Sequence, residues 1–251
     1  MPFTLAHPAI IMPLCRYKTR FISVTGLIVG SMVPDFEFFL KMKTGPNIGH
    51  HFWGIFIFDL PVALIICFVY HNLLRDTFFA HLPNWFRIRF NRYAEFKWNT
   101  YALSNKLVLI TSILVGIFSH FIWDAFTHDD GFFVQQHPFF NNQISVSNHD
   151  VPVYQMLQVF FSFWGLWIMC RVIADMPQHP QNFEDLYQSN LKYWFYISLV
   201  GLLILTIRLV LLPEYISFWD VFMACMGSGI YAWCLVSLFY IKTQTTKSLV
   251  K

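Results

Sequence analysis

Apolar stretches long enough to cross a lipid bilayer dominate this sequence and leave few folds open to it. A membrane-spanning helix needs about 20 predominantly apolar residues. Four stretches meet this length easily: 107–127, 153–174, 193–213 and 219–241. Hydrophobic residues make up 56% of the chain and charged residues only 12%, about half the charged share of a soluble domain. The sequence therefore predicts an integral membrane protein.

Two further apolar stretches are interrupted by polar residues. Residues 52–74 contain Asp59 and Pro61, and residues 21–40 contain an acidic far end and small residues suited to close helix packing. We count both and expect an all-α fold, a polytopic membrane helical bundle of about six transmembrane helices. The sequence shows no internal repeat and no low-complexity linker, so we expect one helical membrane domain over residues 1–251.

Basic residues are clustered in a way that predicts orientation. Lys and Arg gather before the first span, in segment 75–106 and after residue 241, whereas segment 128–152 has none. Because cytoplasmic segments carry the excess of Lys and Arg, we expect 75–106 to be a basic cytoplasmic loop and 128–152 an outer loop. Both termini are then cytoplasmic, and residues 1–20 form a short or re-entrant N-terminal segment.

One basic segment alternates with aromatic residues. The run "NWFRIRFNRY" at residues 84–93 is typical of an interfacial helix on anionic lipid headgroups, although such a run could also bind RNA. In a chain of this composition we favour the first interpretation. The expected partners are therefore membrane lipids and no nucleic acid.

The stretch "SHFIWDAFTHDD" places His120, Asp124 and His128 at steps of four. Such steps advance only about 40° around a helix, so the three side chains share one stripe. Ionisable groups at membrane depth cost roughly 3 kcal/mol each on insertion scales, and they persist where something pairs with them. Imidazole nitrogens and carboxylate oxygens are ligands that zinc, manganese or iron accept.

Residues of the same chemistry occur at the expected outer ends of other spans. Asp35 ends the first span, and the adjacent pair His50 and His51 begins the second. Together with His120 and Asp124 they make a possible set of three or four metal ligands. His7 lies in the apolar N-terminal segment and reaches them only if that segment is re-entrant, as buried backbone permits.

Each of these residues also has a structural interpretation. His120 and Asp124 could hydrogen-bond each other, and His128 could be a polar cap at the helix end. Asp35 after Pro34 resembles a helix boundary. Asp59, just before Pro61, could satisfy backbone groups freed by the proline. The metal hypothesis therefore depends on convergence of residues that are far apart in the sequence.

Four stretches together resemble a known family: "MPFTLAHPAIIMPL", "GSMVPDFEFFL", "GHHFWGIFIFDLP" and "LVGIFSHFIWDAFTH". They are similar to an uncharacterised family of bacterial membrane proteins, domain of unknown function 4184. The layout more distantly resembles LexA-regulated inner-membrane proteins that are classed as metal-dependent hydrolases. The resemblance implies a bacterial cytoplasmic (inner) membrane location and a metal. The metal-binding residues that it implies are His7, Asp35, His50 or His51, His120 and Asp124.

These observations favour a metal-dependent hydrolase that acts at the outer membrane–water interface on a lipid or related substrate. The expected cofactor is a divalent metal, zinc first, which would lower the pKa of a bound water. Glu37 or Asp59 could serve as general base or orient a ligand histidine. A transporter or proton- or ion-coupled carrier is the alternative, and a non-catalytic membrane scaffold is a third.

Overall fold

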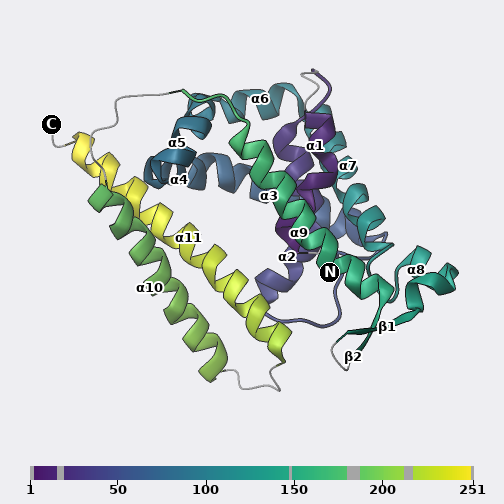
Figure 1. Ribbon diagram of the computed structural model, residues 1–251. Helices are drawn as coiled ribbons and strands as arrows, with labels where there is room; N and C mark the ends of the chain where they lie inside the picture. The colour runs from purple at the N-terminus through teal and green to yellow at the C-terminus, as the bar shows by residue number, and fades with distance from the viewer. Residues whose placement is uncertain (1–2, 16–19, 147–148, 180–186, 212–216, 250–251) are drawn as a thin grey trace. The chain divides into compact units, whose positions relative to one another are not determined.

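Five helices of the structure are long and apolar enough to cross a membrane. The structure is a computed structural model that describes residues 3–15, 20–146, 149–179, 187–211 and 217–249. The five candidate spans are Ile55–His81, Lys106–Asp124, Val153–Ala174, Asn190–Leu211 and Phe218–Ile241. Apart from one short hairpin, the described segments are helical or irregular, which confirms an all-α membrane bundle (Figure 1).

The sixth expected span is present as a helix. Helix α2 (Val24–Lys41) covers residues 21–40 closely, but its second half carries Asp35, Glu37 and Lys41. It carries three charged residues and is not one of the five candidate spans. Its small residues allow α2 to pack closely against a neighbouring helix, as described below.

Contacts between residues divide the chain into two compact units. The first unit comprises residues 1–35, 48–64 and 104–175, and the second comprises 36–47, 65–103 and 176–251.

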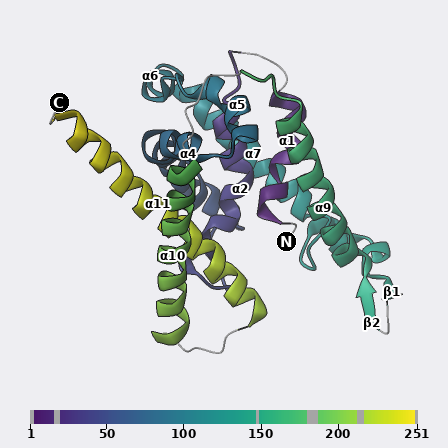
Figure 2. The same cartoon turned by 60° about the vertical axis from the view of Figure 1, so that its left-hand side comes forward.

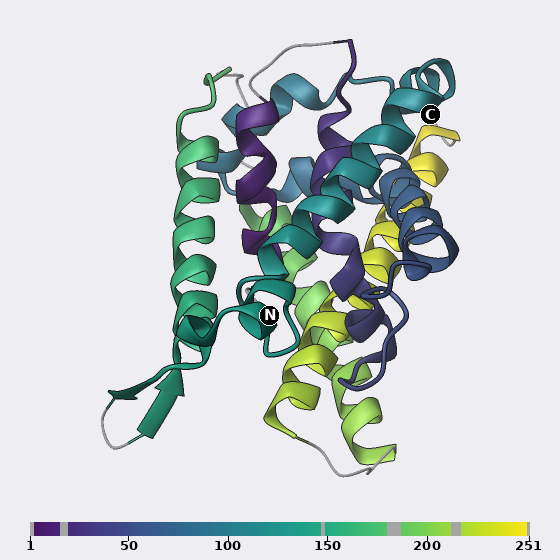
Figure 3. The same ribbon diagram turned by 90° about the vertical axis from the view of Figure 1, so that its right-hand side faces the viewer.

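In the first unit, two helices approach closely through glycine. Helix α2 runs beside α7 (Lys106–Asp124) (Figure 3). A Cβ on Gly30 of α2 would lie 2.2 Å from the carbonyl oxygen of Ile113, and a Cβ on Gly116 of α7 would lie 2.4 Å from that of Leu27. Only glycine allows this approach, which places the turn of α2 that carries Asp35 beside the turn of α7 that carries His120.

The N-terminal segment packs within the same unit. It forms a 3-10 turn, η1 (Thr4–Ala6), followed by helix α1 (Pro8–Cys15). The turn η1 contacts α9 (Val153–Ala174), and α1 contacts both α7 and α9. The N-terminal segment is thereby brought beside α7, although it is too short to span the bilayer.

The described part of the segment between α7 and α9 contains two short helical pieces and a hairpin. These are α8 (Phe132–Gln136), the 3-10 turn η5 (Pro138–Asn141), and strands β1 (Gln143–Val146) and β2 (His149–Pro152). The strands are antiparallel, with Ile144 opposite Val151. The expected outer loop 128–152 therefore has secondary structure of its own.

The segment expected to be a basic loop, 75–106, is largely helical. It contains α4 (Arg75–His81), α5 (Asn84–Phe90), the 3-10 turn η4 (Asn91–Tyr93) and α6 (Trp98–Ser104). In α5 the Arg89 guanidinium lies 4.1 Å from the centroid of the Trp85 ring. One basic and one aromatic residue of this run thus contact each other on a short helix.

The second unit also contains the two C-terminal helices, α10 (Tyr187–Leu211) and α11 (Phe218–Leu249), which pack along each other (Figure 2). Helix α11 also contacts α4 and the π-helical turn η3 (Tyr70–Leu74). The span Ile55–His81 comprises a π-helical turn at its start, η2 (Ile55–Asp59), then α3 (Leu60–Val69), η3 and α4.

Candidate metal centre

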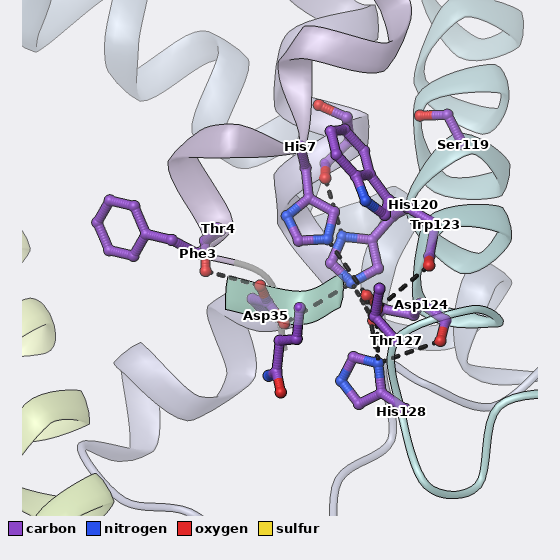
Figure 4. Close-up of polar contacts among 12 residues, drawn as sticks. Phe3, Thr4, His7, Asp35, Ser119, His120, Trp123, Asp124, Thr127 and His128 are labelled. Carbon is purple, nitrogen blue, oxygen red and sulfur yellow. Dashed lines mark hydrogen bonds and ion pairs between the residues drawn. The ribbon is translucent and has the colours of Figure 1, made fainter. Parts of the chain in front are cut away.

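The structure brings five of the residues singled out in the sequence together in the first unit. Asp35 lies on α2, His120 and Asp124 lie on α7, His7 follows η1, and His50 lies in the loop before η2. Figure 4 shows His7, Asp35, His120 and Asp124 directed toward one another. All four are buried, whereas the His50 side chain keeps 21% exposure.

Four side-chain atoms form a compact set, which we call the four-donor set: His50 Nε2, His120 Nε2, Asp35 Oδ1 and Asp124 Oδ2. His50 Nε2 lies 3.5 Å from Asp35 Oδ1 and 3.7 Å from Asp124 Oδ2. His120 Nε2 lies 3.7 Å and 3.1 Å from the same two oxygens. Tetrahedral ligands at zinc bonding distance lie about 3.3 Å apart, so these four distances are of the right size for ligands of one cation. His50, His120 and Asp124 form one group close enough to hold a metal ion.

Hydrogen bonding does not account for the convergence. His120 Nε2, Asp35 Oδ1 and Asp124 Oδ2 are buried and have no hydrogen-bond partner. Buried polar atoms in proteins are rarely left in this state, and each such case needs an explanation. A cation bound between the atoms is one explanation, since it would satisfy all three.

In Asp35, His120 and Asp124, the second polar atom of the side chain contacts a neighbouring residue. Asp35 Oδ2 accepts a hydrogen bond of 2.6 Å from the Thr4 hydroxyl. His120 Nδ1 lies 2.9 Å from the Ser31 carbonyl oxygen, which can only accept, so Nδ1 carries a proton and, in the neutral imidazole, Nε2 presents its lone pair. Asp124 Oδ1 lies 3.3 Å from His7 Nε2. These contacts orient the remaining atoms toward one another.

Thr4 and Ser31 were not singled out in the sequence. Ser31 acts through its backbone carbonyl, which every residue has, so no sequence pattern could indicate it. The Thr4 hydroxyl had one weak indication, its position three residues before His7 in an apolar segment.

His7 and His128 flank the four-donor set. The His7 ring stacks on His120 with 4.1 Å between centroids, and His7, Asp35 and His120 form a second group close enough to hold a metal ion. His128 Nδ1 lies 3.2 Å from the Asp124 carbonyl and 3.5 Å from Asp124 Oδ1. Two histidines outside the four-donor set, His7 and His128, thus contact Asp124.

The adjacent histidines differ in position. His50 faces Asp35 and Asp124, whereas His51 is exposed and stacks on Trp53 with 5.7 Å between ring centroids. Burial lowers the pKa of His50, but the nearby Asp124 and Asp35 carboxylates outweigh it and raise that pKa to about 10. The two carboxylates therefore strongly favour positive charge at this position.

The two expected general bases lie outside the four-donor set. Glu37 belongs to the second unit, where it is buried and forms an ion pair with Lys41. Asp59 is buried in the first unit at the end of η2. A Cβ on Gly49 would lie 2.9 Å from Asp59 Oδ1, so the backbone just before His50 passes close to this carboxylate. Catalytic roles for Glu37 and Asp59 stay predictions.

Comparison with known proteins places the chain in a family. No curated protein and no solved structure matches it. The model of one family, described as Domain of unknown function (DUF4184), matches residues 1–241. Because this match covers nearly the whole sequence, the chain belongs to the DUF4184 family.

Proposed function

We propose that the first unit binds a divalent metal, zinc first, through the four-donor set, and that the protein is a metal-dependent hydrolase. The observation that carries the proposal is the convergence of three buried atoms without hydrogen-bond partners, those of Asp35, His120 and Asp124. Two imidazoles and two carboxylates are a ligand set that zinc accepts. The polar atoms of Asp35, His120 and Asp124 that lie outside the four-donor set contact Thr4, Ser31 and His7. Metal ligands are usually oriented by hydrogen bonds of this kind.

A water bound as a fifth ligand beside the four-donor set would have a lowered pKa, and the metal would polarise an ester or phosphoryl oxygen. The chain's own part is to hold the ligands and to leave one approach open. His50 is the most exposed of the four ligands, so a substrate would enter on its side. Asp59 remains the candidate in this unit for a general base or an orienting partner.

Exposed aromatic side chains beside His50 support a lipid or related substrate. Phe52, Trp53 and Phe56 follow it within six residues and are all more than half exposed. They precede or begin a candidate membrane span, where exposed apolar groups face lipid. An amphiphile held in the bilayer would reach the site along this surface, which we propose to lie at the outer membrane–water interface.

Elemental analysis of detergent-purified protein tests the metal. We expect a near-stoichiometric divalent metal in the wild type and none in His120→Ala. His51→Ala is the matched control, because that imidazole lies outside the four-donor set, and it should keep the metal. A wild-type protein that stays metal-free after incubation with zinc would refute the proposal.

The hydrolytic step needs a separate test. We expect the zinc-loaded wild type to release product from a panel of phospholipid and lipid-ester vesicles, and His120→Ala or chelator-treated protein to release none. A metal-loaded protein without activity on any member of the panel would limit the proposal to metal binding.

A carrier is the second candidate, and one observation favours it. The span Ile55–His81 contains two π-helical turns, η2 and η3, and interruptions of this kind are frequent at functional sites. Ion flux into proteoliposomes that depends on Asp124 but yields no hydrolysis product would favour the carrier.

A further inference from the structure

We propose that the β1–β2 hairpin inserts one face into the headgroup–acyl boundary of the bilayer, so that it anchors the outer segment to a lipid surface. This inference is independent of the metal. It uses the alternation of side chains on the two strands, the exposure of one face and the position of the hairpin relative to two membrane spans.

The hairpin has an apolar face and a polar face. Successive residues of a strand point to opposite faces, and directly paired residues share a face. The register therefore places Ile144, Val146 and Val151 on one face, with His149 at its tip. Gln143, Ser145 and Asp150 lie on the other face, where the Ser145 hydroxyl donates a 2.5 Å hydrogen bond to Asp150 Oδ1.

The described part of the protein leaves most of the apolar face uncovered, and of its four residues Val151 alone is half-buried. Ile144 is 43% exposed and Val146 is 47% exposed, and every residue of β1 is exposed. A two-stranded hairpin on its own is marginally stable in water and needs an apolar contact on one face. Lipid would supply that contact.

The position of the hairpin selects lipid as the occupant. Strand β2 ends at Pro152 and α9 begins at the next residue, where the Val153 amide donates to the Asn142 carbonyl at 3.1 Å and closes the hairpin base. The 22 residues of α9 extend about 33 Å, close to the thickness of the hydrocarbon layer. The hairpin base is therefore at the membrane boundary.

The other end of the segment is fixed at the same boundary. The segment begins where α7 ends at Asp124, and α7 is also a candidate span. Two consecutive spans return the chain to the face from which it left, so the segment 125–152 lies along one membrane face.

Aromatic residues of the same segment fit a lipid boundary. Phe133 stacks on Phe126 with 4.1 Å between centroids, and Phe140 lies 6.2 Å from Phe126. Their neighbours Phe132 and Phe139 are 66% and 62% exposed instead. Aromatic side chains are enriched at membrane–water boundaries. Segment 125–152 has no Lys or Arg, so the contact is apolar and should be insensitive to salt.

Spin labels on single cysteines test the proposal. In full-length protein with the five native cysteines replaced, labels at Ile144→Cys and Val146→Cys would be compared with a label at Ser145→Cys on the polar face. The protein is reconstituted into phosphatidylcholine vesicles. We expect labels 144 and 146 to collide several-fold more with oxygen, which partitions into lipid, than with a water-soluble nickel chelate. Label 145 should show the reverse preference at low and high salt.

Three outcomes would overturn the proposal. Equal and high accessibility of all three labels to nickel would place the hairpin in water, and dipolar broadening between labels would indicate a second copy of the chain as the occupant. Loss of the alternation at high salt would indicate an electrostatic contact. The same labels in a His120→Ala background should behave alike, which separates this result from the fate of the metal proposal.

Discussion

Each unit buries a group of polar side chains, but the two groups are satisfied in different ways. In the second unit, the Thr77 hydroxyl donates to Ser237 Oγ at 3.1 Å, and Tyr193 and Ser237 share a hydrogen bond of 3.0 Å. The Trp233 indole donates to the Tyr193 hydroxyl, also at 3.0 Å. The polar atoms of this network satisfy one another.

In the first unit, some polar side-chain atoms lie about as close together as in this network, but they do not form hydrogen bonds with one another. His120 Nε2 and Asp124 Oδ2 are 3.1 Å apart, yet neither has a hydrogen-bond partner. A saturated network of hydroxyl and indole groups holds helices together and has no lone pairs left for a ligand. Convergent imidazole and carboxylate atoms are instead ligands that a cation accepts. The difference separates a structural polar core from a candidate binding site.

The largest expected effect is on metal affinity when a donor of the first unit is removed. Asp124→Asn keeps the shape but removes the charge, so we expect zinc affinity to fall more than about a hundredfold, beyond the usual effect of losing a supporting partner. Competition with a chromophoric chelator measures it. Asp220→Asn in the second unit, whose carboxylate accepts hydrogen bonds from Thr44 and Ser217, is the matched control. Equal zinc affinity in the two variants would show that the carboxylate of the first unit binds metal no better than that of the second.

A smaller loss is expected when only a supporting contact is removed. Thr4→Val keeps the side-chain shape but deletes the hydrogen bond to Asp35 Oδ2, and such contacts typically contribute about 10–100-fold to metal affinity. The same chelator competition applies. Thr111→Val on α7 removes an exposed hydroxyl that bonds only to its own helix and should leave the affinity unchanged. A Thr4→Val protein with wild-type affinity would show that Asp35 needs no support.

In the second unit the corresponding change should affect stability alone. Ser237→Ala removes the hydroxyl shared by Thr77 and Tyr193, and we expect the free energy of unfolding in detergent to fall by about 1 kcal/mol. Zinc affinity should not change. A loss of metal in this variant would contradict the view that its network is only structural.

The sequence predicts much of the fold because lipid imposes strong requirements on length and polarity. The stretches 107–127, 153–174, 193–213 and 219–241 each overlap a helix of the structure over most of their length, and residues 212–213 lie outside the described part of the chain. The small residues of 21–40 were expected to allow close helix packing, and Gly30 does permit close contact with α7. The π-helical turns and the hairpin were not predicted, because they depend on neighbouring packing and turn geometry rather than on apolar length.

For the candidate site, the sequence predicts residue types better than geometry. His120 and Asp124 stand out because their spacing places them on one helical stripe. The approach of His7 depends on the path of a short apolar segment, which no local pattern specifies. The contact of the Ser31 carbonyl with His120 cannot be predicted from the sequence for the same reason, because it arises from tertiary structure.

Substitution of His51 is expected to have the smallest effect, and its comparison with His50 gives the sharpest test of this limit. The sequence cannot choose between His50 and His51, because both are imidazoles at the start of the same span. The structure points His50 at both carboxylates and stacks the exposed His51 on Trp53. We therefore expect His51→Ala to keep zinc affinity and to change unfolding free energy by no more than about 0.5 kcal/mol, whereas His50→Ala loses the metal. Isothermal titration with zinc compares the two, and the reverse ranking would show that the loop before η2 presents the other imidazole.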